Sequence, residues 1–172
     1  MPKKQGWAHP HLPNEGKTCE WYTPRHVFDA LALTFDLDPC APAGGVPWVP
    51  AAKHYSVVDG GLSQPWFGRV WLNPPYGSAT GRWVERLAEH GWGIALVFSR
   101  TDVRWWHRVA PMATAVCFVR GRLTFVAGAG QSAPGNSGGP SALLAFGADC
   151  ARALAGSGLG IVYWTSPEEI AC

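Results

Sequence analysis

Apolar residues along this chain fall into short runs, separated by polar segments that contain glycine and proline. The run over residues 93–98 is continuously apolar, as expected of a strand that is covered on both faces. Most of the other runs also have the length of a strand rather than of a helix. They predict strands over residues 35–38, 55–58, 70–73, 115–119, 123–126, 142–146 and 160–164.

Four segments between these runs carry apolar residues at helical spacing. The first follows Thr23-Pro24, since threonine is a frequent N-cap and proline suits the first helical position, and it is expected to end near Leu33. The others are expected over residues 81–90, 102–109 and 149–155. Strands that alternate with helices predict an α/β fold with a doubly wound, mostly parallel sheet.

Composition defines the organisation of the chain. The 172 residues suffice for one domain with a real core, expected over residues 19–172. Residues 1–18 are polar and rich in Lys, His, Pro and Gly, which predicts a flexible arm. Residues 40–54 and 127–140 have the composition of loops. With 15% charged and 47% hydrophobic residues, the chain is expected to fold.

Charge and cysteine content narrow the class of protein further. A net charge of +2 permits nucleic acid binding without the large excess of a dedicated polycation. No apolar run approaches the roughly 20 residues that span a bilayer, and the first residues lack the apolar stretch of a signal peptide, so a cytoplasmic protein without membrane contact is expected. Five cysteines without a Cys-x-x-Cys pair argue against a zinc site, and no metal is predicted.

The tetrapeptide Asn73-Pro74-Pro75-Tyr76 carries the most specific chemistry of the chain. Pro75 lacks an N–H and restricts Pro74 to extended conformations, which leaves the Pro74 carbonyl as an outward acceptor. Asn73 adds a side-chain carbonyl, and Tyr76 adds a face for stacking. Two acceptors beside a stacking surface suit a planar molecule with an exocyclic amine, such as adenine. The alternative is a proline-rich turn that only closes a strand.

Three other segments are predicted to lie at strand ends or in loops, and ligands of open α/β sheets bind at the carboxyl ends of strands. Taken singly, each segment has an ordinary explanation as a helix start, a strand end or a turn. The segments are Trp21-Tyr22-Thr23-Pro24, Asp38-Pro39-Cys40-Ala41, and Asp59-Gly60-Gly61-Leu62 followed by Trp66.

In this order around the tetrapeptide, the segments resemble the small, phage-type DNA N6-adenine methyltransferases, which depend on S-adenosylmethionine and carry an NPPY motif. The resemblance extends from roughly Glu20 to Gly147. It implies the seven-stranded methyltransferase sheet with an antiparallel hairpin near the C-terminal edge. The usual glycine-rich cofactor loop is not clear here, and Ala43-Gly44-Gly45 is a loose substitute. Further matching segments are Arg82-Trp83-Val84, Ser99-Arg100-Thr101-Asp102, Trp105-Trp106-His107 and Gly121-Arg122-Leu123-Thr124-Phe125.

The resemblance also implies roles for individual residues. The catalytic residues would be Asn73, Pro74, Pro75 and Tyr76. Asp59 would face the adenosine end of S-adenosylmethionine. The other cofactor-binding residues would be Tyr22, Thr23, Pro24, Asp38, Pro39 and Cys40, at its methionine end. An ionised aspartate at position 38 suits the cofactor's ammonium group as a charge-assisted acceptor.

The implied reaction is the transfer of a methyl group to N6 of adenine in DNA, by in-line displacement on a flipped base. Asn73 Oδ1 and the Pro74 carbonyl would accept the two N–H bonds of the amine and stabilise the positive charge that develops on nitrogen. Adenine in RNA, cytosine N4 and a protein glutamine amide remain alternative acceptors. A non-catalytic module that binds nucleic acid is a further alternative.

Basic residues are predicted to hold the phosphates of DNA, the expected partner. The alternative for each is a solvated surface charge. Sequence selection is expected to come from loops such as residues 127–140, and no oligomeric state is predicted. The candidates are Arg100, Arg104 and Arg122, with Lys3 and Lys4 on the arm, and Arg108 and Arg120 as neighbours.

Overall fold

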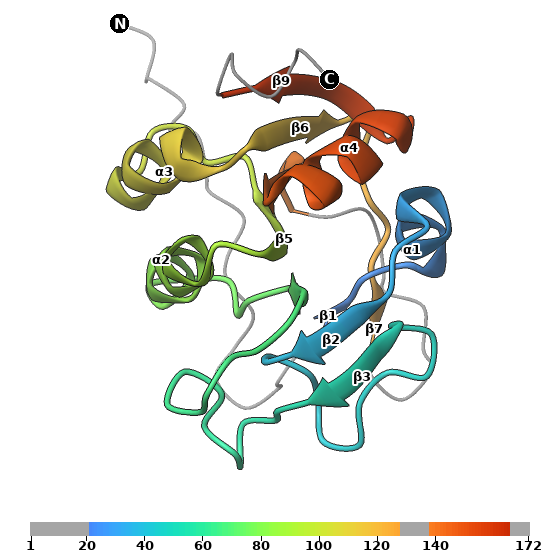
Figure 1. The fold of residues 1–172 in the computed structure, drawn as a ribbon, viewed down its shortest axis with the longest axis vertical. Helices are drawn as coiled ribbons and strands as arrows, with labels where there is room; N and C mark the ends of the chain where they lie inside the picture. The colour runs from blue at the N-terminus through green and yellow to red at the C-terminus, as the bar shows by residue number, and fades with distance from the viewer. Residues whose placement is uncertain (1–20, 128–137, 166–172) are drawn as a thin grey trace, which may run out of the picture.

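A computed structural model describes residues 21–127 and 138–165 of the chain. The predicted arm, with Lys3 and Lys4, and most of the predicted loop 127–140 lie outside these residues. Seven strands form one sheet in the order β3-β2-β4-β5-β8-β6-β9 (Figure 1). Their bounds are Phe35–Asp38 (β2), Ala51–His54 (β3), Val70–Leu72 (β4), Gly93–Phe98 (β5), Ala115–Val119 (β6), Ser141–Phe146 (β8) and Gly160–Trp164 (β9).

The sheet is mixed, so the expectation of a mostly parallel sheet is wrong. Strands β3, β2, β4 and β5 are parallel neighbours, whereas β5 with β8, β8 with β6, and β6 with β9 are antiparallel pairs. Helices connect β4 to β5 and β5 to β6, as parallel strands require. The described part of the connection from β6 to β8 contains no helix, and β8 returns antiparallel between β5 and β6. An apolar run predicts a strand but not its direction.

Helices cover both faces of this sheet, which confirms the predicted α/β architecture (Figure 1). Helices α1 (Arg25–Leu31) and α4 (Ala148–Gly156) pack on one face, where Phe28, Trp71 and Leu154 belong to one core cluster. Helices α2 (Thr80–His90) and α3 (Arg104–Val109), continued by the short 3-10 helix η1 (Ala110–Met112), pack on the other face.

Two local predictions near the N-terminal half of the sheet are wrong. The N-cap of α1 is Pro24 rather than Thr23, whose buried Oγ1 has no hydrogen-bond partner among the described residues. The strand predicted over residues 55–58 lies instead at Ala51–His54, within a predicted loop, because it pairs there with β2. Residues 57–58 are two valines that are 91% and 86% exposed, so their strand propensity does not act without a paired neighbour.

The strand predicted over residues 123–126 is also largely absent from the main sheet. Only Val126–Ala127 form a strand, β7, which pairs antiparallel with β1 (Trp21–Tyr22) in a separate two-stranded sheet. Leu123 and Phe125 are instead buried in the core cluster of α1 and α4. The antiparallel pairing expected near the C-terminal edge is present in the pairs β8 with β6 and β6 with β9.

Candidate functional site

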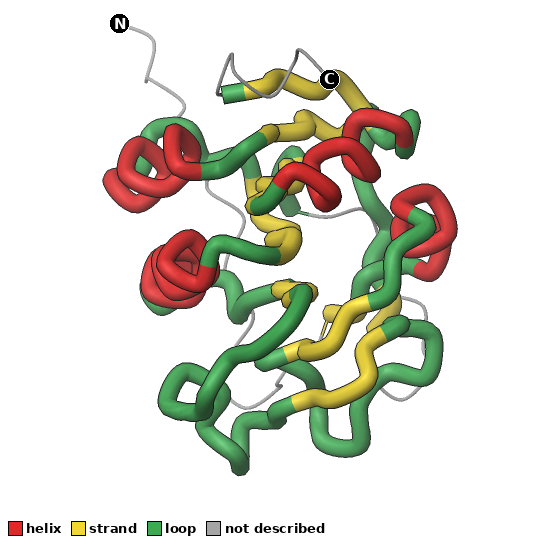
Figure 2. The backbone as a smooth tube through the Cα atoms, in the orientation of Figure 1, coloured by secondary structure: helices red, strands yellow, loops and turns green. Residues whose placement is uncertain are grey.

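Four parallel strands bring their carboxyl ends to one edge of the sheet, and the predicted site residues gather there. Asp38 is the last residue of β2, and Asn73 follows the last residue of β4. His54 ends β3, and Ser99 follows β5. Long connections, drawn as green tube in Figure 2, join β2 to β3 and β3 to β4. In open α/β sheets, this edge is where ligands bind.

Two hydrogen bonds hold the amide of Asn73 in a defined orientation. Its Nδ2 donates to the carbonyl of Trp21 at 2.9 Å, and its Oδ1 accepts from the hydroxyl of Tyr76 at 3.1 Å. Because a carbonyl can only accept, the nitrogen must face Trp21, which leaves Oδ1 on the other side. The Pro74 carbonyl accepts no hydrogen bond from the residues that the structure describes. This turn therefore presents two acceptor oxygens, one of which Tyr76 engages.

The half-buried ring of Tyr76 packs against two other aromatic side chains. It stacks on Phe98 with centroids 4.2 Å apart and an angle of 21°, and Phe125 contacts it edge-on at 6.2 Å. Burial raises the pKa of Tyr76 well above the ordinary value, so the phenol stays protonated and donates. Phe98 thus takes one face of the Tyr76 ring, so the predicted stacking of a planar ligand requires the opposite face.

Asp38 is a buried carboxylate that faces a cavity. Asp38 is only 6% exposed, and its Oδ1 accepts a hydrogen bond from the backbone N–H of Cys40 at 3.0 Å. Burial raises the pKa of Asp38 to about 7, and the Cys40 hydrogen bond opposes this only in part. The cavity has a volume of about 240 Å³ and is also lined by Gly44, Gly45 and His54.

The predicted substitute for a glycine-rich loop forms a wall of this cavity. Gly44 and Gly45 have φ values of +86° and +73°, which side-chain-bearing residues rarely adopt. A Cβ on Gly45 would also lie 3.1 Å from the imidazole of His54. Sequence reasoning did not identify His54, because a single histidine in a predicted loop carries no signal of its own.

The predicted segments Asp38-Pro39-Cys40 and Asp59-Gly60-Gly61-Leu62 lie against each other. A Cβ on Gly61 would lie 2.0 Å from the Pro39 carbonyl oxygen, so only glycine permits this approach. Burial and the charge of Asp38 raise the pKa of Cys40 to about 12, which makes its thiol unreactive.

Asp59 itself is exposed and closes a local turn. Its Oδ2 accepts from the backbone N–H and from the hydroxyl of Ser56, both at 2.7 Å, and these bonds lower the pKa of Asp59. Asp59 does not line the cavity at Asp38. The structure therefore brings its loop to the site but directs this carboxylate to Ser56.

Tyr22, Thr23 and Pro24 connect β1 to α1 next to a tryptophan that sequence reasoning missed. The indole Nε1 of Trp48 donates to the Thr23 carbonyl at 2.8 Å, and its ring meets Tyr22 edge-on at 6.3 Å. The side chains of Thr23 and Pro24 are buried. The sequence did offer one signal for Trp48, since a large aromatic residue is unusual in a segment rich in Pro and Gly.

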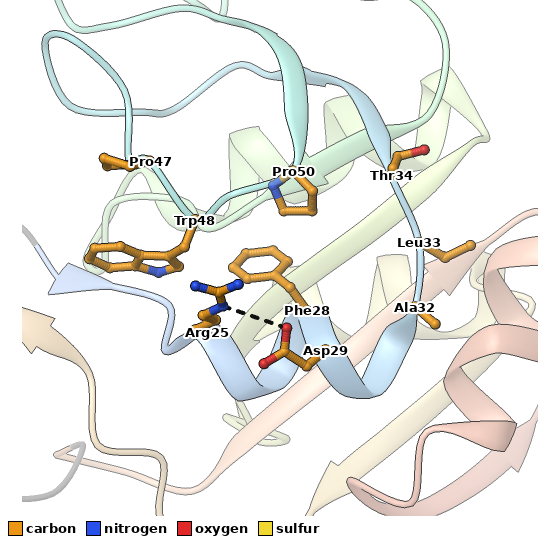
Figure 3. Close-up of a pocket in the computed structure, with 9 residues that line it drawn as sticks. All are labelled: Arg25, Phe28, Asp29, Ala32, Leu33, Thr34, Pro47, Trp48 and Pro50. Atoms are coloured by element: carbon orange, nitrogen blue, oxygen red, sulfur yellow. Dashed lines mark ion pairs between the residues drawn. The ribbon is translucent and has the colours of Figure 1, made fainter.

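A second, larger cavity of about 410 Å³ lies at the opposite ends of β2 and β3, where Thr34 and Pro50 precede the two strands (Figure 3). Phe28 and Trp48 form its aromatic walls, and Arg25 pairs with Asp29 at 3.8 Å across its exposed side. None of the predicted site residues lines it. Its size is therefore not a reason to prefer it over the smaller cavity at Asp38.

The predicted phosphate-binding arginines are exposed and follow strands that point to the same edge. Arg100 follows β5 and Arg122 follows β6, and these strands share a direction because both are antiparallel to β8. Arg104 begins α3. Arg108, one turn further along α3, forms an ion pair with Glu85 instead.

Two absences apply to the described residues. Residues 21–127 and 138–165 contain no group of three or more His, Cys, Asp or Glu side chains that could hold a metal ion. Within the same residues, no helix has the length and apolar character needed to cross a membrane.

Comparison with known proteins connects this geometry to a family. The model of the family described as DNA N-6-adenine-methyltransferase (Dam) matches residues 10–150, which include the Asp38 cavity, the Asn73 turn and Arg100. The match begins within the segment predicted to be an arm. Searches of curated proteins and of solved structures found no match. Because the family model matches most of the chain, the chain belongs to the DNA N-6-adenine-methyltransferase (Dam) family and is a DNA adenine methyltransferase.

Proposed function

We propose that the chain methylates N6 of adenine in DNA at the carboxyl edge of the sheet, with S-adenosylmethionine as the methyl donor. The observation that carries this proposal is the turn at Asn73, which holds two acceptor oxygens at the end of β4, next to the strand β2 that ends in the buried carboxylate of Asp38. Family membership supports the reaction class. The geometry supports the assignment of roles within it.

The cavity at Asp38 fits the charged end of the cofactor. A carboxylate that is buried at this depth favours a cationic partner, because burial otherwise drives it towards the neutral form. Gly44 and Gly45 leave space at the wall for a close approach of ligand to backbone. The cofactor, when bound, supplies an electrophilic methyl group on a sulfonium centre.

Asn73 and Pro74 activate and orient the amine of adenine. The lone pair of an aromatic amine is delocalised into the ring, so the amine is a poor nucleophile. Acceptance of its two N–H bonds by Asn73 Oδ1 and the Pro74 carbonyl localises that lone pair and stabilises the positive charge of the transition state. The bond from Nδ2 to Trp21 keeps Oδ1 directed to the amine.

Tyr76 can stay in place during this process. Its hydroxyl donates to Asn73 Oδ1, and because an amide oxygen has two lone pairs, the same oxygen can also accept from the adenine amine. The raised pKa of Tyr76 excludes the phenol as a base near neutral pH. The methylated nitrogen is acidic, so it can lose its proton to solvent without a strong base. The base reaches this position only after it is flipped out of the duplex.

The test is methyl transfer by the purified full-length chain, with nucleosides and amino acids analysed by mass spectrometry. Labelled S-adenosylmethionine is supplied with unmodified DNA, RNA or a protein pool in separate reactions. N6-methyladenine from DNA is expected, and Asn73→Ala should lower kcat by about 10²–10³-fold, the usual cost of removing a hydrogen bond to developing charge. Arg152→Ala, on the exposed side of α4, is the matched control and should retain activity.

Other outcomes would contradict the proposal in distinct ways. Methylated cytosine, RNA adenine or glutamine in place of N6-methyladenine would reassign the substrate. Full activity of Asn73→Ala would remove the proposed role of the Asn73 turn while leaving the family assignment intact.

A further inference from the structure

The buried hydroxyl of Thr80 forms hydrogen bonds to the backbone of the Asn73 turn. Thr80, at the start of α2, is 5% exposed. Its Oγ1 donates to the Pro75 carbonyl at 2.8 Å and accepts from the backbone N–H of Gly77 at 3.0 Å. These two bonds engage the backbone groups directly on either side of Tyr76.

This hydroxyl does not serve the helix in which it lies. The N-cap of α2 is Ala79, with helical backbone angles and no side-chain capping bond. Both bonds of Thr80 Oγ1 leave the helix and reach back to the turn. The turn needs such a partner, because neither of its prolines has an N–H with which to close it.

We propose that Thr80 is a positioning residue for methyl transfer, an inference that rests on the proposed function. Pro74 precedes a proline and is held extended, and successive carbonyls of an extended chain point in different directions. By holding the Pro75 carbonyl towards α2, Thr80 leaves the Pro74 carbonyl directed to the site. It also sets the backbone of Tyr76, whose hydroxyl and ring contact Asn73 and Phe98.

The test compares Thr80→Val, which keeps the shape but removes both hydrogen bonds, with Thr80→Ser, which keeps the hydroxyl. Thr80→Val should lower kcat for DNA methylation by about 10–100-fold, since a small misplacement of a catalytic group has an effect of this size. KM for DNA and for S-adenosylmethionine should change by less than about threefold. Thr80→Ser should restore kcat to within about threefold of the wild-type value.

Thermal unfolding of each variant separates positioning from stability. If Thr80→Val keeps wild-type kcat, the inference is wrong, although wild-type DNA methylation would leave the proposed function intact. It is also wrong if Thr80→Ser loses as much activity as Thr80→Val, or if both KM values rise with the loss of kcat. If Thr80→Val does not fold, Thr80→Ala takes its place, and its kcat and KM values are compared with those of Thr80→Ser by the same criteria. A wild-type chain that methylates no DNA would contradict the proposed function instead.

Discussion

At Asn73, one amide group is held by two segments that are distant in sequence. Trp21 lies 52 residues away and fixes the nitrogen, whereas Tyr76 lies three residues away and occupies the oxygen. A short motif predicts which atoms can accept hydrogen bonds, but it does not show that an internal phenol already engages one of them. In the free enzyme Tyr76 therefore uses one lone pair of Asn73 Oδ1, and the second lone pair is left for the target amine.

Asp38 shows how burial turns a motif residue into a pH-dependent one. Its pKa is about 7 in the folded chain, against about 3.9 for an aspartate in an unfolded chain. A pKa raised by folding stabilises the chain fully below about pH 4, and this contribution is lost as pH rises through 7. It no longer changes once the folded carboxyl is also fully ionised, roughly one pH unit above 7.

We predict that the stability of the cofactor-free protein falls by about 1 kcal/mol per pH unit between pH 5 and 7 on account of Asp38. Asp38→Asn, which can still accept from the Cys40 N–H, should remove this slope. Urea unfolding of both proteins at several pH values measures it. Equal slopes in the two proteins would show that Asp38 does not titrate in this range.

At the scale of elements, glycine decides how the loops at the site pack. The Val57–Val58 pair suggested a strand, yet β3 forms earlier because β2 offers its edge to residues 51–54. The chain then turns at Asp59 and returns, so that Gly61 lies against Pro39. The contact joins the loop after β3 to the segment after β2, which lies beside the cavity at Asp38.

We predict that Gly61→Ala weakens cofactor binding, because its Cβ would lie 2.0 Å from the Pro39 carbonyl oxygen and one backbone must shift. The expected loss of stability is roughly 1–3 kcal/mol, as for other overpacked sites. Gly156→Ala in α4 is the matched control. Its Cβ would meet no heavy atom within 4 Å, and alanine favours a helix by up to about 1 kcal/mol.

Thermal shift with and without S-adenosylmethionine measures both effects. If S-adenosylmethionine raises the melting temperature of Gly61→Ala as much as that of Gly156→Ala, the loop at Gly61 does not affect cofactor binding.

At the scale of the whole molecule, the directions of the strands place positive charge on the edge that carries Asn73. Arg100 and Arg104 are exposed near the end of β5, whereas Arg108 is held by Glu85 further along α3. DNA binding through phosphates releases counterions, so affinity falls with salt in proportion to the number of contacts.

We predict that Arg100→Ala and Arg104→Ala each reduce the slope of log K against log salt by about 0.9, the value for one lost phosphate contact. Arg108→Ala, which removes the same charge from the same helix as Arg104, should leave the slope unchanged. Fluorescence anisotropy with a labelled duplex measures these slopes. A change for Arg108→Ala as large as for Arg104→Ala would indicate a general effect of net charge instead.

Local sequence was sufficient to predict the elements whose pattern of apolar and polar side chains is distinctive by itself. The apolar run of β5 and the helical spacing of α2 and α4 predicted these elements almost to the residue, because burial dictates such patterns. The tetrapeptide at Asn73 likewise predicted a turn after a strand, since proline restricts the backbone regardless of its surroundings.

Only the tertiary structure decided the features that depend on pairing between distant segments. These are the position of β3, the antiparallel entry of β8, the bond from Asn73 to Trp21 and the stacking of Tyr76 on Phe98. Each arises from a contact whose free energy depends on two separated parts of the chain, so neither part alone indicates it. The local sequence therefore determined which groups can act on an amine, and the fold determined where they meet and what holds them there.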